Sequence, residues 1–162
     1  MNDYDRRSEA LWASIDEYDD EAEFRAKVDE LAAELPSGSP VASFEQACAW
    51  DSTGHSDRAI PLYRLALERG REGERRRRAV IQMSSSLRNM GAVEESVRLL
   101  TAERAQPSDS LDDAVSAFLA LALVDSGRER EAVSLALGAL APHLPRYQRS
   151  LGNYARVLVE EQ

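Results

Sequence analysis

The side chains that most often carry chemistry are few in this sequence and poorly spaced for it. His55 and His143 stand far apart, and neither has Asp, Glu or Cys neighbours at the spacing of a metal site. The triple serine Ser84–Ser86 lacks the G-x-S-x-G context of a nucleophile elbow. Walker A and G-x-G-x-x-G motifs are absent. The sequence therefore predicts no catalytic residue, no metal ligand and no cofactor, and a protein that is not an enzyme.

Arginine has a more suggestive pattern. A run of four, Arg75–Arg78, begins a segment in which polar residues recur at spacings of 4, 3, 4, 3 and 4. The residues of this polar stripe are Arg71, Arg75, Arg78, Gln82, Ser85 and Asn89. Such spacings keep side chains on one face of a helix, so the stripe predicts a polar helix face. The opposite face, which we expect to be buried, holds Val80, Met83, Leu87 and Met90.

Two interpretations of the polar stripe stay open. Guanidinium forks grip carboxylates, and Ser, Asn and Gln side chains bond an extended backbone, so the stripe suits a peptide ligand. The alternative is a solvated helix face with intramolecular salt bridges, for instance to Asp51, Glu72 or Glu74.

Repeats organise the elements around this stripe. Gly54, Gly91 and Gly127 follow one another at intervals of 37 and 36 residues, each after a helical apolar pattern. Glycine there can take the left-handed conformation that ends one helix and turns into the next. Small residues recur five positions after each glycine (Ala59, Ser96, Ala132) and seven before it (Ala47, Ser84, Ala120). They predict a close helix crossing in every unit. Twelve positions after the glycine, Glu103 breaks a pattern of alanines at 66 and 139.

This pattern resembles the tetratricopeptide repeat over roughly residues 40–141, although each unit is two to three residues longer than usual and the expected proline is displaced. The runs IQMSSSLRNMG, GREREAVSLALGALAPHLPRY and RSLGNYA look like a bacterial branch of small standalone members without an assigned activity. The resemblance implies an all-α, right-handed superhelical array of helix pairs. It also implies that the first helix of each pair lines a concave groove.

The expected helices fall into an N-terminal part and a repeat part, separated by the PSGSP break at 36–40. Their approximate ranges are 4–17, 20–35, 41–53, 56–70, 74–90, 93–105, 111–126, 129–141 and 145–161. We expect residues 1–36 to form an N-terminal cap that packs through Phe24, Val28 and Leu31. Residues 37–162 should hold three helix pairs and a C-terminal capping helix, which carries Tyr147, Leu151, Tyr154, Val157 and Leu158. The two parts are expected to form one structural unit.

Composition narrows the choice of partner and compartment. The net charge is −9, and residues 1–36 alone carry 12 acids and four bases. An acidic chain argues against nucleic-acid binding, although the arginines keep it open as an alternative. No run of 18 apolar residues and no signal-peptide pattern is present, which predicts no membrane association and a cytoplasmic protein. Cys48, the single cysteine, is expected to be a small buried hydrophobe.

The function predicted from these patterns is protein or peptide binding in the groove, as an adaptor, scaffold or regulator. Asp51 and Arg88 stand three residues before their glycines and Asp125 two before its own, so similar turns should bring them to one surface. Arg149 and Asn153 lie four apart and so share a helix face. The predicted partner-binding residues are Asp51, Arg78, Gln82, Ser85, Arg88, Asn89, Asp125, Arg149 and Asn153. The main alternative is a homo-oligomer whose terminal helices form the interface; a small-ligand pocket inside the groove is a further one.

Overall fold

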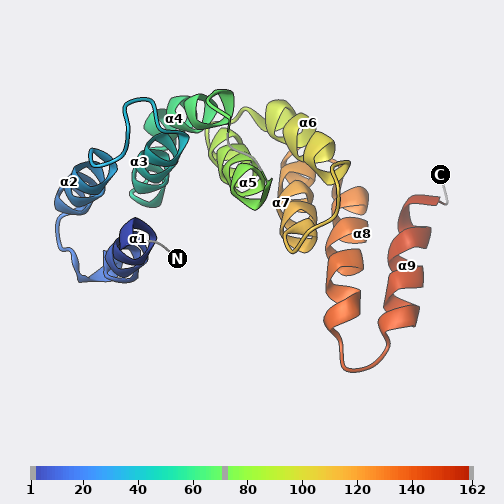
Figure 1. Ribbon diagram of the computed structural model, residues 1–162. Helices are drawn as coiled ribbons and strands as arrows, with labels where there is room; N and C mark the ends of the chain where they lie inside the picture. The colour runs from blue at the N-terminus through green and yellow to red at the C-terminus, as the bar shows by residue number, and fades with distance from the viewer. Residues whose placement is uncertain (1–2, 71–72, 161–162) are drawn as a thin grey trace. The chain divides into compact units, whose positions relative to one another are not determined.

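The computed structural model describes residues 3–70 and 73–160, and every regular element within them is helical. The chain divides into two compact units, Met1–Glu72 and Gly73–Gln162. The elements of the first unit are α1 (Asp3–Ala13), the 3-10 helix η1 (Ile15–Glu17), α2 (Glu21–Ala32), α3 (Pro40–Ser52) and α4 (Ser56–Glu68). Those of the second are α5 (Gly73–Asn89), α6 (Val93–Arg104), α7 (Asp112–Asp125), α8 (Glu129–Leu140), the 3-10 helix η2 (Ala141–His143) and α9 (Gln148–Glu160) (Figure 1). The expected all-α helical repeat array is confirmed.

Polar caps fix where α2 and α3 begin. The Asp20 carboxylate accepts a hydrogen bond from a backbone N–H in the first turn of α2. Ser39 does the same for α3, accepting from the N–H of Val41 at 3.2 Å, and Pro40 follows it as the first helical residue. Both arrangements satisfy backbone donors that a helix start leaves unpaired. The break around residues 36–40 is thus a helix start with its own cap.

The three repeat glycines occupy matching turns, as predicted. Gly54, Gly91 and Gly127 have φ values of 78°, 80° and 74°. In each turn the residue after the glycine donates its N–H to a carbonyl five residues back, as His55 does to Trp50 at 2.9 Å. The glycine itself donates three residues back, which completes the Schellman arrangement. A Cβ on any of the three would meet nothing within 4 Å, so the backbone conformation and not space requires glycine here.

Small residues are buried at each helix crossing. Ala47 and Ala59 in α3/α4 have no exposed surface, and neither do Ser84 and Ser96 in α5/α6. Ala132 of α8 is also buried, within a cluster formed by α5, α6, α7 and α8. A crossing without bulk lets the helices approach closely, so these positions are fixed by size.

The N-terminal helices pack on the first repeat. Phe24 and Val28 of α2 form a buried cluster with Ala49 of α3, while Leu31 is half-buried. On α1, Leu11 and Trp12 pack against the same cluster. Phe24 and Val28, two of the three residues predicted for this contact, are therefore part of it.

Three expected buried residues are exposed. Met90 is 55% exposed because α5 ends at Asn89 and Met90 lies in the turn before Gly91. Tyr147 is 75% exposed and precedes α9 with a left-handed φ of 70°. Tyr154 is 71% exposed, because the buried face of α9 centres on Ala155. The capping helix thus packs through smaller residues than the tyrosines suggested.

Candidate partner-binding site

The polar stripe on α5 lies on the least buried side of that helix. Arg78 and Asn89 are exposed, and Gln82 and Ser85 are half-buried. Val80, Met83 and Leu87 are buried, as their spacing predicted. Arg71, which was expected to begin the stripe, lies outside the described residues. A polar side chain on this face can therefore reach a partner without disturbing the core of the unit.

The arginine run divides between structure and surface. Arg76 Nη1 donates to both carboxylate oxygens of Glu103, at 2.8 and 2.6 Å. Arg77 is only 3% exposed and pairs with Asp109 and Asp112 at 2.8 and 2.7 Å. These two arginines thus form intramolecular salt bridges. Their partners are not the acids that the sequence suggested. Glu103, the apparent break in the repeat, is buried. Its carboxylate is the one that Arg76 of α5 binds.

The same network holds the connection between α6 and α7. Arg77 Nη1 donates to the backbone carbonyl of Pro107 at 3.2 Å. Hydrogen bonds from the Ser108 hydroxyl and the Asp109 backbone, together with Arg77, lower the pKa of Asp112. A carboxylate that stays ionised keeps this loop attached to the buried guanidinium.

Beside the stripe, α5 packs against α7 and an ion pair joins their last turns. Arg88 Nε donates to Asp125 Oδ2 at 2.5 Å, so the structure brings these two predicted residues together. The 36-residue register places Leu121 and Val124 of α7 where α5 has Ser85 and Arg88. Leu121 is 48% exposed and Val124 is 47% exposed. We call the described part of the polar stripe, from Arg75 to Asn89, together with Leu121 and Val124 the α5–α7 face.

The other predicted residues belong to other helices. Asp51 belongs to the first unit, where it accepts hydrogen bonds from Ser56 Oγ at 3.3 Å and from the Tyr63 hydroxyl at 3.4 Å. Burial raises the pKa of Tyr63, which holds that hydroxyl as a donor. Arg149 and Asn153 of α9 do share a face, and with two neighbouring residues they line an open hollow of about 320 Å³.

A family model described as tetratrico peptide repeat matches residues 40–158. The chain belongs to the tetratricopeptide repeat family. The match extends past the region that the repeat pattern indicated and takes in α9. No curated protein and no solved structure is significantly similar to the chain. Tetratricopeptide repeats generally mediate protein–protein interaction, and the family is typically non-enzymatic.

Sequence reasoning missed one hollow of this tetratricopeptide chain. It measures about 450 Å³ and is lined by residues of α6, α7, α8 and α9, among them Arg104, Leu135 and Arg156. It exists because α9 packs on α8 and η2 but does not pack closely on α7. The signal in the sequence was Gly138 and Gly152, two helical glycines that leave the walls without side chains. In 3–70 and 73–160, no helix has the length and apolar content to cross a membrane.

Proposed function

We propose that the protein is an adaptor that binds a segment of another protein across the α5–α7 face. The observation that carries this is the meeting of two chemistries on adjacent packed helices. Donors on α5, such as Arg78, Ser85 and Asn89, are exposed or half-buried, and the exposed Leu121 and Val124 belong to α7, which packs against α5. Exposed apolar side chains next to polar groups are typical of interaction surfaces.

The face favours a segment of mixed character. Leu121 and Val124 offer apolar area, and burying each fully would contribute about 1–2 kcal/mol. Arginine and amide donors on α5 suit a carboxylate and the carbonyls of an extended chain. The Arg88–Asp125 pair carries both signs at one end, so a mixed-charge segment fits better than a uniformly acidic one.

Affinity capture from the native cells, with the full chain as bait, tests this proposal. Leu121→Glu should abolish retention of the partner, and Asn89→Ala should weaken it. Val133→Glu is the matched control, because Val133 lies on α8 of the same unit with 46% exposure. We expect the affinity for the purified partner to fall at least tenfold in Leu121→Glu, about 1.4 kcal/mol. A native partner bound equally well by Leu121→Glu, Asn89→Ala and the wild type would contradict the proposal.

A second candidate function, homo-oligomerisation through α9, has its own observation. Tyr147 and Tyr154 are exposed on or next to this terminal helix, and tyrosine is enriched in protein interfaces. Light scattering over a range of concentrations tests it. A size that grows with concentration in the wild type and not in Tyr154→Ser would favour the oligomer. A constant monomer size would exclude it.

A further inference from the structure

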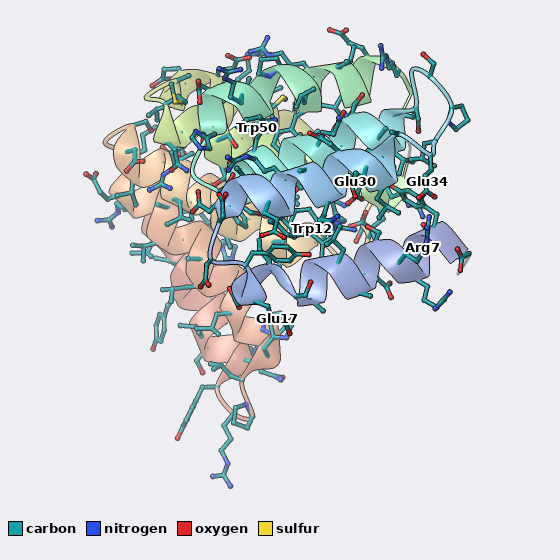
Figure 2. All side chains as sticks on the ribbon, turned by 90° about the vertical axis from the view of Figure 1, so that its left-hand side faces the viewer. Arg7, Trp12, Glu17, Glu30, Glu34 and Trp50 are labelled. Atoms are coloured by element: carbon teal, nitrogen blue, oxygen red, sulfur yellow. The ribbon has the colours of Figure 1, made fainter. Side chains whose placement is uncertain are left out.

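Helix α1 packs on α2 and is hydrogen-bonded to α3 through one carboxylate. Glu45 Oε2 accepts hydrogen bonds from Trp12 Nε1 at 2.7 Å and from Ser8 Oγ at 3.3 Å. Directly before Ser8, Arg7 pairs with Glu34, which follows the end of α2. Figure 2 shows Trp12 between α1 and α2, with Arg7 facing Glu34. The indole of Trp12 and the guanidinium of Arg7 are thus the polar groups that hold α1 in position.

Apolar contacts accompany these polar anchors. The Trp12 ring meets Phe24 edge to face, with centroids 5.1 Å apart. Leu11 and Ile15 pack against the same buried cluster of α2 and α3. Aromatic contact of this geometry contributes beyond the area that it buries. Trp12 is therefore the residue on which docking of α1 depends most.

The repeat register shows what kind of surface α1 covers. Subtracting the 37 residues between Gly54 and Gly91 maps Gln82 of α5 onto Glu45 of α3. Asn89 maps in the same way onto Ser52. Glu45, to which α1 is hydrogen-bonded, is therefore the counterpart of one residue of the polar stripe on α5. In the first repeat a helix of the chain itself contacts the residue at that position.

Charge makes α1 a poor occupant of this site. Residues 3–13 hold three acids and two bases, a net charge of −1. Residues 14–72, which include its binding surface, hold 14 acids and six bases, a net charge of −8. Like charges on the two sides weaken docking, and opposite charges would strengthen it. A basic helix with the same anchors would therefore bind this surface more tightly than α1 does.

We propose that the α3 surface at Glu45 is a docking site for a basic amphipathic helix that carries a tryptophan, and that such a helix displaces α1. The indole would donate to Glu45 as Trp12 does, and a basic residue would take the place of Arg7 beside Glu34. This site lies in the first unit and does not depend on the α5–α7 face.

Isothermal titration calorimetry of peptides into the full chain tests the proposal. The probe is a synthetic peptide of residues 1–20 with Asp3→Lys, Asp5→Lys and Glu9→Lys. Its control carries Trp12→Ala as well and so keeps the added charge. We expect the probe to bind at least tenfold more tightly than the control. Equal binding would mean simple charge attraction and would overturn the proposal.

Variants of the chain distinguish displacement from binding beside α1. Trp12→Ala in the chain removes the internal competitor, so the probe should bind at least tenfold more tightly than to the wild type. Adding Glu45→Ala to that variant should reverse the gain. Circular dichroism checks that both variants fold, and Arg7→Glu weakens α1 in a second way if Trp12→Ala does not. An unchanged affinity in a folded variant with weakened α1 would overturn the proposal.

Hydrogen exchange locates the event in the wild-type chain. Binding of the probe should speed amide exchange in residues 3–13, because α1 leaves its seat. Binding with unchanged protection there would place the peptide elsewhere and contradict displacement. If the wild type dimerises instead by exchanging α1 between copies, its size in light scattering will rise with concentration. The occupant would then be a second copy and not a basic partner helix.

Discussion

Helix pairs α3/α4 and α5/α6 turn at equivalent glycines and cross at equivalent residues, yet their interiors differ in chemistry. The first pair buries Ala47 against Ala59, and the second buries Ser84 against Ser96. Ser96 Oγ donates to the Ser84 carbonyl at 2.8 Å, which gives one of the two buried hydroxyls a partner. The crossing therefore demands small residues, and apolar character is optional.

The pairs differ more at the next equivalent position, where α4 has Ala66 and α6 has Glu103. Both residues are buried. A carboxylate is tolerated in the second pair because Arg76 and Arg77 come from the same unit to meet it. In the first pair the residues at the arginine positions are Ser39 and Pro40, which begin α3 instead. A buried charge in a repeat thus requires its counter-charge at a fixed offset.

The two units also differ in net charge. Residues 1–72 hold 17 acids and eight bases, while residues 73–162 hold 12 of each. The first unit therefore carries the whole net charge of −9. Several arginines of the second unit, such as Arg76, Arg77 and Arg88, pair with its own acids. Any long-range attraction of a basic partner belongs to the first unit.

The largest effect is expected from Glu103→Ala, which gives the second pair the residue of the first. It leaves the buried Arg77 without one of its carboxylates, and breaking a buried pair costs about 3–5 kcal/mol. Urea unfolding followed by circular dichroism measures it. Glu131→Ala is the control, because the Arg128–Glu131 pair is half-exposed and such pairs contribute about 0–1 kcal/mol. Equal effects of the two changes would refute the assigned difference.

Enlarging the crossing should harm both pairs equally. Ala59→Leu and Ser96→Leu each insert bulk at a position without exposed surface, with an expected cost of about 1–3 kcal/mol. The same unfolding experiment checks it. Ala136→Leu on the exposed side of α8 should leave the midpoint nearly unchanged. If only one pair were sensitive, the crossings would not be equivalent.

The turn glycines should show a smaller and again equal cost. Gly54→Ala and Gly91→Ala keep space for the methyl group but force a left-handed backbone, which costs about 1–2 kcal/mol. Gly152→Ala is the opposite case, because a helical glycine replaced by alanine should stabilise by about 0.5–1 kcal/mol. The melting temperatures of the three variants give the order of their stabilities. A stable Gly91→Ala would contradict the conformational argument.

The smallest effects concern the two serines. Ser84 Oγ is buried and has no hydrogen-bond partner in 3–70 or 73–160, so Ser84→Ala should stabilise by about 1 kcal/mol. Ser96→Ala should destabilise by about the same amount because it removes the bond to the Ser84 carbonyl. Opposite signs from two identical substitutions at one crossing would sharpen the contrast with α3/α4. If both substitutions changed the free energy of unfolding in the same direction, the two hydroxyls would not differ in their contribution to stability.

Local rules predicted the fold well because repeated turns need repeated residues. The interval between glycines determined the turns, and the residues at fixed offsets from them were the buried ones. The errors arose where a helix ended early or turned another face inward. Met90 continues the apolar spacing of α5 in the sequence, but the helix ends before it and Met90 lies in the turn at Gly91. Tyr154 suggested a buried aromatic face, yet Ala155 beside it makes the contact with α8 through the Ser134 hydroxyl.

The candidate site was less accessible from sequence, because pairing partners come from other helices. Nothing in the run Arg75–Arg78 distinguishes Arg77, which is buried, from Arg78, which is exposed. Glu103 broke the pattern of alanines in the other repeats, but that mismatch alone did not identify it as the partner of Arg76 and Arg77. The repeat register predicted that Arg88 and Asp125 lie near one surface, but it did not predict the ion pair between them. The seat of α1 on Glu45 was not predicted either, since a hydrogen bond between helices leaves no periodic signal.

Both tryptophans of the chain, Trp12 and Trp50, lie in the first unit. Indole emission therefore reports on that unit alone, while ellipticity reports on the helices of both. If the two signals change together on heating, the units melt as one; if they separate, each unit has its own transition. A Trp50→Phe chain goes further, because its remaining indole belongs to α1. Its emission maximum would then read directly whether that helix is seated or released.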